Sequence, residues 1–579
     1  YALRPIGTFH ALPIARGKSV FRSNWIRDFG EFYGPTLFLA ESSATTGGLD
    51  SLLEPTGNIK LAQDAAARAF GADKVFFVTN GTSTSNKMVY QALCQPGDIV
   101  IVDRNCHKSH HYGCVLAGAQ PYYVEAFPLT AYSMYGSVPL RTIKKALLDL
   151  KAAGRLDKVR MIALTNVTFD GHMYDTRRVM EECLAIKPDL VFMWDEAWFG
   201  FGRFNWMYRR RTAMGARREI AEWFADPRSL EAYLEQEKTL GADLDPADPR
   251  LLYMRLVPDP RVARIRVYQT NSTHKSMSSL RQGSMVLVGD QDFHHHEAPF
   301  HEAVFTHAST SPNLQIIASL DVARRQMELE GYELVTHAIA LAIEIRRDVN
   351  AHPLVSKYFR VLEPAEMIPQ EFRPSGLVSY TESGVTWAQA LEAYRNDEFV
   401  LDPTRLTVVC GTAGYDGTQF KGILAADYGI QLNKTSRNSV LLQTNINNTR
   451  SDVANLLRVL VEISRKIEAG LKQGGAPVQA AFEQRVKSLM EDVPGLPNFS
   501  RFHDRFRSDP SGSTLEGDMR SAFYMAYREE CCEHLKLDDP EVDRRINEGP
   551  PLVSANFVIP YPPGFPIMVP GQVIEADTI

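Results

Sequence analysis

The chain has 579 residues, a mass of 65.0 kDa and a formal net charge of −6 at neutral pH. A chain of this length exceeds what one hydrophobic core normally supports, so at least two domains are expected. The acidic balance argues against a protein that binds nucleic acid through bulk positive charge.

The lengths of the apolar runs and the pattern of cysteines indicate the cellular compartment of the protein. No apolar run reaches the length needed to span a bilayer and no signal peptide is visible, so we expect no membrane partner. The seven cysteines are an odd number and include no CxxC pair. Scattered cysteines of this kind are typical of a reducing compartment, so the sequence favours a cytoplasmic protein.

A run of glycine and hydroxyl residues follows the first predicted strand. A helix is predicted for residues 58–70 and a buried strand for 74–79, which leads into Asn80-Gly81-Thr82-Ser83-Thr84-Ser85-Asn86 and a helix over 87–94. Backbone N–H groups and the helix dipole at such a junction face an anion, which favours a phosphate cradle. An ordinary N-cap with surplus hydroxyls would explain the same residues.

The next predicted strands bring polar residues to one edge of a sheet. Residues 98–103, 161–165 and 190–194 read as buried strands separated by helical patterns, which indicates a mostly parallel sheet with helices on both faces. His107 and Asp195 follow two of these strands, at the edge where ligands bind in open α/β sheets. His107 could stack on an aromatic ring and Asp195 could pair with a protonated ring nitrogen. A solvated histidine and a helix-capping carboxylate are the alternatives.

Residues 205 to about 260 interrupt this alternation with clustered arginines and a polar, helix-prone run. We interpret them as a charged surface insertion, because neighbouring acidic residues argue against a nucleic-acid site. The run His294-His295-His296 is interpreted as a solvated loop rather than a metal site, since adjacent histidines do not face one point.

A lysine stands at the end of another predicted strand, over residues 265–270. The sequence there reads Ser272-Thr273-His274-Lys275-Ser276. Such a lysine can form a Schiff base if desolvation or nearby positive charge lowers the pKa of its amine. A surface lysine in a polar loop is the alternative.

The rest of the chain indicates further domains. A helix is predicted from Leu314 to about Glu330, strands at 406–409, 429–432 and 440–443, and an amphipathic helix at 456–471. We expect four segments: an N-terminal arm or linker that packs on something such as a partner subunit (1–60), a large α/β domain (61–335) with the charged insertion, a small α/β domain (336–472) and a C-terminal domain (473–579).

Together these residues are the parts that a pyridoxal phosphate enzyme needs. A lysine holds the aldehyde, a carboxylate keeps the pyridine nitrogen protonated, a flat side chain stacks on the ring, and hydroxyls hold the phosphate.

The motifs resemble those of the bacterial ornithine/lysine/arginine decarboxylases, which have the aspartate aminotransferase type I fold. The resemblance covers nearly the whole chain and its motifs come in family order. They are Asn80 to Asn86, Asp103 to Ser109, Thr168 to Gly171, Asp195 to Trp198, Ser272 to Lys275, His307 to Pro312 and Pro560 to Gly571.

The resemblance implies roles for particular residues. Lys275 would bind the cofactor aldehyde, Asp195 would pair with the pyridine nitrogen, and His107 and Ala197 would lie on the two faces of the ring. His274 or Lys275 would protonate the substrate carbon, and Trp198 would line the substrate side. The phosphate would be held by Thr82, Ser83 and Ser272, with Ser309 reaching the phosphate of a neighbouring subunit in a homodimer.

The sequence also departs from the family. The receiver-like N-terminal wing of the larger enteric enzymes is absent from this chain, which favours a dimer over their decamer. The family's closing Pro-Gly-Glu reads Pro570-Gly571-Gln572. The carboxylate that reads the substrate side chain is not identified, with Glu516 and Asp518 as the candidates.

Three functional hypotheses follow. The first is decarboxylation of arginine, lysine or ornithine to the corresponding amine and CO2. The second is another reaction with pyridoxal phosphate on the same scaffold, namely transamination, oxidation or decarboxylation of a non-basic amino acid, because a fold does not fix the reaction. The third is a non-catalytic regulatory homologue, against which the presence of Lys275, Asp195 and His107 argues.

Overall fold

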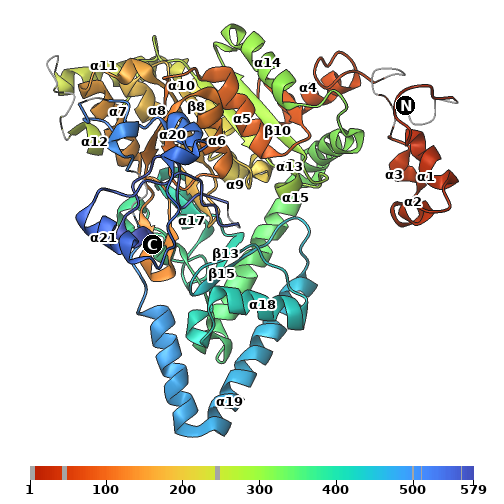
Figure 1. Ribbon diagram of the computed structural model, residues 1–579, viewed down its shortest axis with the longest axis vertical. Coiled ribbons are helices and arrows are strands. Elements are labelled where there is room, and N and C mark those ends of the chain that lie inside the picture. The colour runs from red at the N-terminus through yellow and green to blue at the C-terminus, as the bar shows by residue number, and fades with distance from the viewer. Residues whose placement is uncertain are drawn as a thin grey trace.

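A computed structural model describes the chain except for residues 1–6, 42, 44–48, 242–244, 246–247, 249, 498–500, 510 and 562–563. Figure 1 shows a large upper body built on one sheet, and a smaller lower part that carries α18 and α19. No helix within the described ranges is long and apolar enough to cross a membrane.

The large body is organised around a seven-stranded sheet with the strand order β1-β10-β9-β8-β6-β2-β3. The five strands from β9 to β3 pair in parallel, and β10 and β1 complete one edge with antiparallel pairs. The predicted mostly parallel sheet is therefore confirmed. The strands are β1 (Lys74–Val78), β2 (Ile99–Asp103), β3 (Gln120–Val124), β6 (Val159–Thr165), β8 (Val191–Asp195), β9 (Arg266–Asn271) and β10 (Ser284–Asp290).

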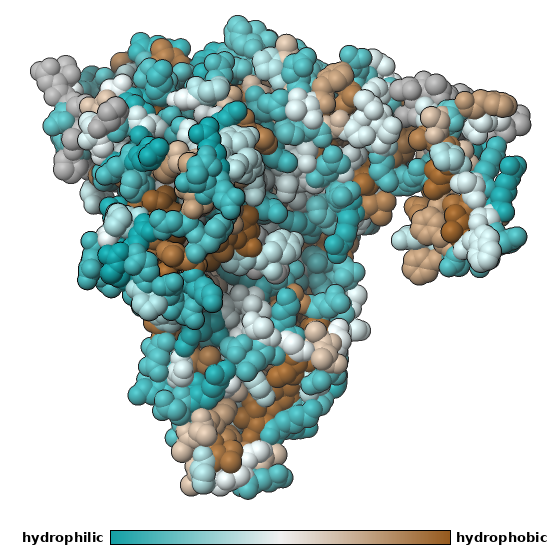
Figure 2. Space-filling view, viewed as in Figure 1, coloured by the Kyte–Doolittle hydropathy of each residue, from teal (hydrophilic) through white to brown (hydrophobic). Residues whose placement is uncertain are grey.

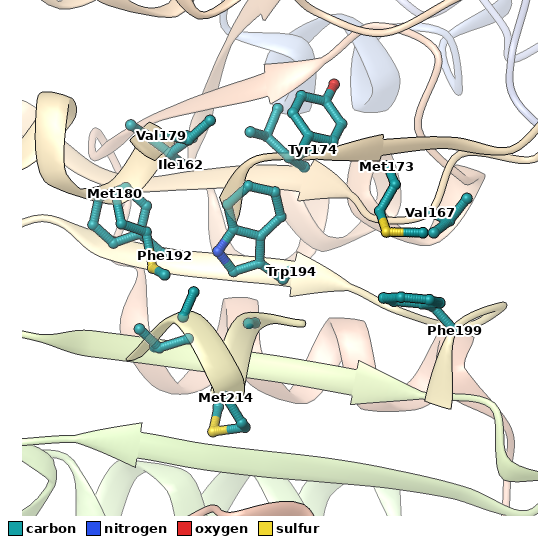
Figure 3. Close-up of a cluster of buried hydrophobic side chains, with 14 of the residues drawn as sticks. Ile162, Val167, Met173, Tyr174, Val179, Met180, Phe192, Trp194, Phe199 and Met214 are labelled. Atoms are coloured by element: carbon teal, nitrogen blue, oxygen red, sulfur yellow. The ribbon is translucent and has the colours of Figure 1, made fainter. Parts of the chain in front are cut away.

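Both faces of the sheet are covered, because successive side chains of each strand point to opposite sides. On β8, Phe192 and Trp194 face one core cluster, and Val191 and Met193 face the other. Figure 3 shows the first cluster, in which the rings of Trp194 and Tyr174 have their centroids 5.7 Å apart. The first face carries α4 (Asn58–Phe70), α7 (Leu140–Ala152), α8 (Thr176–Ile186) and α10 (Ala213–Phe224), and the second carries α5 (Thr82–Leu93), α6 (Lys108–Ala117), α14 (Glu297–His307) and α20 (Met519–Met525).

The lower part is built on a four-stranded antiparallel sheet in the order β11-β13-β15-β14. The strand predicted at residues 429–432 is wrong: α18 ends at Tyr428, and the pairing strand begins at Lys434 instead. The elements here are β11 (Arg360–Val361), β13 (Arg405–Val409), α18 (Gly417–Tyr428), β14 (Lys434–Thr435) and β15 (Ser439–Gln443). Helices α16 (Pro364–Met367) and α17 (Trp387–Asn396) instead bury Met367, Ala393 and Tyr394 in the core of the large body.

Two long helices connect these parts. The helix predicted from Leu314 to about Glu330 continues as α15 (Leu314–Ala351), and its buried side chains contact both the large core and the core of the lower part. Helix α19 (Arg450–Met490) changes direction at Gly475, whose φ of 64° is left-handed, so its two arms form the V at the bottom of Figure 1. The boundary predicted near residue 473 falls inside α19.

The segment from 205 to 260 is only partly a surface insertion. It forms α9 (Trp206–Arg209), α10, α11 (Pro227–Leu240) and α12 (Arg250–Tyr253). Arg211, which was expected on the surface, is buried and donates to the carbonyl oxygens of Ala393, Tyr394 and Asp397 at the end of α17. The last carbonyls of a helix lack the N–H partners of a following turn, and Arg211 supplies donors to them, although the carbonyl of Ala393 also accepts from the backbone N–H of Asp397.

The N-terminal helices stand apart from the body in Figure 1. They are α1 (Lys18–Arg22), α2 (Arg27–Tyr33) and α3 (Pro35–Phe38). Trp25 and Phe32 are exposed on this lobe, and Figure 2 shows several apolar residues gathered there.

The C-terminal segment packs back on the large body. Helix α20 lies against α6 in the second core, followed by α21 (Pro540–Glu548). Within the predicted motif from Pro560 to Gly571, Pro562 and Pro563 lie outside the described residues. The remaining short elements are α13 (Thr273–Ser276) and the paired strands β4 (Pro128–Leu129) with β5 (Met134–Tyr135) and β7 (His172–Tyr174) with β12 (Phe399–Leu401).

Candidate active site

A cavity of about 1020 Å³ lies at the carboxyl ends of β2, β6, β8 and β9. It brings together nine of the ten residues that the sequence proposed for the site. They are Thr82, Ser83, His107, Asp195, Ala197, Trp198, Ser272, His274 and Lys275.

Lys275 lies in the short helix α13, which follows β9, and its side chain lines this cavity. Its Nζ lies 4.4 Å from the centre of the Trp198 ring. Burial lowers the pKa of Lys275, Asp195 opposes this shift, and Arg405 adds to it. A lowered pKa leaves more of the amine unprotonated, which is what a nucleophilic lysine requires.

Asp195 is held by two side chains that the sequence did not single out. Its Oδ2 accepts a hydrogen bond from Nδ2 of Asn86 at 2.9 Å and lies 3.0 Å from Nε2 of His110. The backbone N–H of Ala197 donates to Oδ1 at 3.0 Å. Burial by itself would raise the pKa of Asp195, but the bonds from His110 and Asn86 outweigh it and lower the pKa from 3.8 to about 2. The carboxylate is therefore ionised at any pH near neutrality.

Asn86 and His110 face each other from α5 and α6. The Oδ1 of Asn86 accepts a bond from Thr270 at 2.8 Å, and His110 Nδ1 lies 3.3 Å from the Tyr90 hydroxyl. Asn86 stood inside a quoted motif, but only the packing of α5 on α6 brings either residue to Asp195. Both helices bury several polar residues, among them Ser85 on α5 and Ser109 and His111 on α6, so the sequence does not single out Asn86 or His110.

The hydroxyl-rich run starts α5 five residues earlier than predicted. Gly81 precedes the helix with a φ of 76°, a left-handed conformation that glycine adopts readily. Thr82 and Ser83 therefore lie in the first helical turn, where backbone N–H groups have no partner within the helix. The Thr82 hydroxyl lies 2.6 Å from that of Ser272 and 2.9 Å from that of Ser284, so three elements contribute to one cluster of donors.

His107 caps α6 and lies against the C-terminal segment. Its Nδ1 accepts from the backbone N–H of Ser109 at 3.3 Å and lies 2.8 Å from the Ser109 hydroxyl. Burial lowers the pKa of His107 from 6.5 to about 4, so the ring is neutral near pH 7. A Cβ on Gly564 would lie 3.4 Å from Cδ2 of His107, so the missing side chain lets residue 564 approach the ring closely.

An aromatic and cationic wall closes another side of the cavity. The rings of Phe169 and Trp198 meet edge to face with centroids 5.0 Å apart, and the Arg405 guanidinium lies 5.2 Å from the centre of the Trp198 ring. Arg405 donates to the Trp198 carbonyl at 3.0 Å, which fixes the backbone behind that ring.

The same wall contains an ion pair that the sequence did not predict. Nζ of Lys434, on β14, lies 2.6 Å from Oδ2 of Asp170, which follows β6. Both residues line the cavity and both are buried. Asp170 Oδ1 is buried and has no hydrogen-bond partner among the described residues.

The Nδ1 of His274 lies 2.9 Å from the carbonyl oxygen of Gly283. Because that oxygen can only accept, Nδ1 carries the hydrogen, and Nε2 is the nitrogen left for other contacts.

The candidate Glu516 does not line the cavity. It is fully buried elsewhere, and its Oε1 lies 2.6 Å from Nε of Arg155. Asp518 instead caps α20 by accepting from the backbone N–H of Ser521.

Ser309 is the tenth proposed residue, and it lies on the surface outside the cavity. Its hydroxyl accepts from the backbone N–H of Ser311 at 3.0 Å. Its proposed contact with a neighbouring subunit stays a prediction.

The residues present fit pyridoxal phosphate. A lysine with a lowered pKa, an ionised buried carboxylate, a neutral imidazole and a cluster of hydroxyls at the start of a helix line one cavity. Lys275, Asp195, His107 and Thr82 would hold the aldehyde, the ring nitrogen, a ring face and the phosphate, respectively.

Comparison with known proteins agrees with this chemistry. Residues 2–226 and 252–460 match the family model described as the major domain of the Orn/Lys/Arg decarboxylases. The lysine decarboxylase LdcA of Pseudomonas aeruginosa is 28% identical over 570 residues, which cover 94% of this chain and 69% of that protein. The constitutive ornithine decarboxylase of Escherichia coli is 27% identical over an alignment of 592 positions, gaps included, that covers 94% of this chain and 74% of that protein.

Comparison with solved structures also finds decarboxylases of basic amino acids. Lysine decarboxylase A from Pseudomonas aeruginosa aligns over 100% of this chain and 73% of its own, with a TM-score of 0.70 and 25% identity. The constitutive lysine decarboxylase of E. coli shares the fold, with a TM-score of 0.65 and 21% identity over 100% of this chain and 75% of its own.

The family match also limits which part of the predicted charged insertion, residues 205–260, is absent from the family model. Residues 227–251 lie between the two matched ranges, so the part of the predicted segment 205–260 that differs from the family is α11 and its flanks. The chain belongs to the Orn/Lys/Arg decarboxylase family and is an amino-acid decarboxylase that uses pyridoxal phosphate.

Proposed function

We propose that the protein decarboxylates a basic L-amino acid, arginine, lysine or ornithine, to the corresponding amine and CO2. The observation that carries this proposal is the placement of Lys275, Asp195 and His107 in one cavity of a chain from this family. Relatives are named as lysine, arginine and ornithine decarboxylases, so the sequence comparison favours none of the three substrates.

Each residue has a distinct task in this proposal. Pyridoxal phosphate supplies, when bound, an electron sink for the electron pair left on Cα as CO2 departs. Asp195 keeps a proton on the ring nitrogen, because its own pKa is too low to take that proton. His107 would orient the ring by contact with one face, and Lys275 would hold the aldehyde.

Protonation of Cα needs a donor within reach of the cavity. His274 lines the cavity and has its Nε2 free of the Gly283 contact, so we assign it the proton delivered to Cα, with Lys275 as the alternative donor. The wall of Trp198 and Phe169 excludes water from this side and so limits competing reactions.

The side chain of a basic substrate needs an acceptor, and we propose Asp170. Its Oδ1 is buried in the wall of the cavity without a partner among the described residues, and a buried unpaired carboxylate oxygen is costly. A substrate ammonium or guanidinium would supply the missing donor. Lys434 already pairs with Oδ2, so it would limit how tightly a second cation binds.

A cytoplasmic homodimer completes the proposal. All seven cysteines are free thiols, which is consistent with a reducing compartment. Ser309 lies at the surface, where a second subunit could contact it.

The test is a screen of the purified protein, loaded with pyridoxal phosphate, for CO2 release from the common amino acids. We expect release from at least one of arginine, lysine and ornithine, and none from the Lys275→Ala variant. Release only from non-basic amino acids, or a keto acid as the product, would favour the alternative reactions.

The assignment of Asp170 is tested separately. Asp170→Asn removes the charge that a distal cation would pair with, so we expect KM for the basic substrate to rise about ten-fold or more while kcat changes less. An unchanged KM would exclude Asp170 as the residue that reads the side chain.

A further inference from the structure

The loop between α13 and β10, residues 277–283, brings an arginine to the active-site cavity. Arg281 lines this cavity together with Gly81, Thr82 and Ser83, the residues at the start of α5. It is not among the residues that the sequence motifs assign to the cofactor or to the substrate.

Hydrogen bonds fix this loop on both sides of Arg281. Before it, the backbone N–H of Leu280 donates to the Ser319 hydroxyl on α15 at 3.0 Å. After it, the carbonyl of Gln282 accepts from the backbone N–H of Gly81 at 2.8 Å. Gln282 has a φ of 71°, a left-handed conformation that is uncommon for a residue other than glycine. The loop therefore holds Arg281 next to the first turn of α5.

The donors at the start of α5 carry no net charge. The Thr82 hydroxyl contacts the hydroxyls of Ser272 and Ser284, and the first backbone N–H groups of the helix lie beside them. A phosphate monoester carries a charge of about −1.5 to −2 near neutral pH. A cation beside these neutral donors would therefore strengthen the binding of a phosphate.

The guanidinium of Arg281 is not committed to another group. It forms neither an ion pair nor a hydrogen bond with any residue that the structure describes. Lys434, another cation in the wall of the cavity, is instead paired with Asp170. Arg281 is exposed, so its guanidinium is accessible to an anion that enters the cavity.

The charge of Arg281 acts on residues inside the cavity. Burial lowers the pKa of His274, and the positive charges of Lys275 and Arg281 lower it further, whereas the bond to Gly283 opposes the shift. The guanidinium is thus close enough to the cavity to influence a group bound there.

Two anionic groups take part in the reaction, the phosphate of the cofactor and the carboxylate of the substrate. A guanidinium binds phosphate oxygens through two parallel, charge-assisted hydrogen bonds. A cation on the substrate carboxylate would stabilise a negative charge that this group loses as CO2 departs, and such an interaction slows the reaction. Both the chemistry and the position beside α5 favour the phosphate.

We propose that Arg281 binds the phosphate of pyridoxal phosphate and supplies the positive charge that the hydroxyls of Thr82, Ser83 and Ser272 lack. The inference depends on the use of this cofactor and not on which amino acid is the substrate.

The experiment compares two ligands, pyridoxal phosphate and pyridoxal, which lacks the phosphate. Each is titrated into the full chain freed of cofactor, and absorbance or fluorescence gives the affinity without turnover. Arg281→Gln should weaken the binding of pyridoxal phosphate about ten-fold or more, because it removes a charge-assisted contact, and should leave the binding of pyridoxal unchanged. Arg281→Lys keeps the charge without the paired bonds and should lose less affinity than Arg281→Gln.

The matched control is Lys108→Gln, which removes an equal charge from the same cavity. Lys108 is exposed and belongs to the opposite side, where its backbone N–H donates to the carbonyl of Gly564 in the C-terminal segment. We expect this variant to weaken the binding of pyridoxal phosphate by less than about two-fold, since an exposed charge without a direct contact is screened.

Three results would overturn the proposal. Unchanged affinity of Arg281→Gln for pyridoxal phosphate, with a raised KM for the substrate, would assign the arginine to the substrate carboxylate. Equal weakening of pyridoxal and pyridoxal phosphate would show that the contact does not involve the phosphate. An equal loss in Lys108→Gln and Arg281→Gln would reduce the effect to the total charge of the cavity.

Discussion

At the scale of single residues, the site depends on how Asp195 is kept ionised while buried. Removal of a carboxylate from water raises its pKa, and the hydrogen bonds from His110 on α6 and Asn86 on α5 reverse that shift. Because the folded pKa lies below the unfolded value, the bonds to Asp195 add stability that is fully present above about pH 4 and is lost as the pH falls towards 2.

We expect that neutralisation of the Asp195 carboxylate lowers the rate of decarboxylation and leaves cofactor binding intact. We expect Asp195→Asn to bind pyridoxal phosphate and to lower kcat about a hundred-fold or more, since a neutral amide cannot hold a proton on the ring nitrogen. Steady-state kinetics and the absorbance of the bound cofactor measure the two effects. A near-normal kcat would contradict the assigned role, and Asn86→Ala should show the same defect in milder form.

The pKa of Glu196, the next residue, is shifted in the opposite direction to that of Asp195. Burial raises the pKa of Glu196 from 4.5 to about 8, in spite of bonds from Ala213 and Asn166, so it is protonated at neutral pH. The folded state then binds a proton that the unfolded state releases, and the free energy of unfolding falls as the pH rises from about 4.5 to about 8.

Glu196→Gln replaces the neutral acid with a neutral amide of the same shape. We expect little change in activity at pH 7, and a gain in the thermal midpoint over the wild type that grows from pH 5 to pH 8, worth on the order of a few kcal/mol. Thermal unfolding across this pH range is the measurement. A gain that does not depend on pH would show that Glu196 is ionised in the folded protein.

At the scale of elements, buried charges position the helices around the sheet. Lys144 on α7 is 1% exposed, and its Nζ donates to Oε2 of Glu182 on α8 at 2.7 Å and to the carbonyl of Met254 at 2.9 Å. Arg178 donates to the other oxygen of Glu182 at 2.7 Å. These bonds tie α7, α8 and the segment after α12 together.

Removal of the lysine should be costly, because it leaves part of the charge of Glu182 buried without compensation. We expect Lys144→Met to destabilise the protein by about 3 kcal/mol, and the neighbouring Lys145→Met, at an exposed pair with Asp149, by less than about 1 kcal/mol. Thermal midpoints of both variants provide the comparison. Equal midpoints would mean that the buried pair adds no more than the surface pair.

At the scale of the whole molecule, the proposed homodimer would place the Ser309 of one subunit at the active site of the other. Ser309→Asp would put a carboxylate against the phosphate and inactivate the neighbouring site, whereas Lys275→Ala inactivates its own. Mixed dimers of the two variants would contain one intact site, since Lys275 and Ser309 then come from different chains.

We therefore expect activity to return when the two inactive variants are refolded or expressed together, as measured by CO2 release. Each variant alone is the control. No recovery from dimers shown to be mixed would contradict a shared site and restrict each active site to one chain.

Much of the site could be predicted from the sequence, because the residues proposed to hold the cofactor stand at strand ends and so occur within recognisable local runs. Lys275 after β9, Asp195 at the end of β8 and His107 after β2 are of this kind. The phosphate run before α5 was also visible, although the start of the helix was misplaced: the hydroxyls that mark a cap also fit the first turn once Gly81 takes a left-handed conformation.

The sequence by itself determined the family, the parallel sheet and the residues at its carboxyl edge, because hydrophobic periodicity and short motifs are local properties of the chain. Only the tertiary structure decided which polar residues meet across elements, such as Asn86 and His110 on Asp195, and Lys434 on Asp170. These contacts join residues far apart in the chain, and their geometry is set by helix packing, which leaves no periodic signal in the sequence.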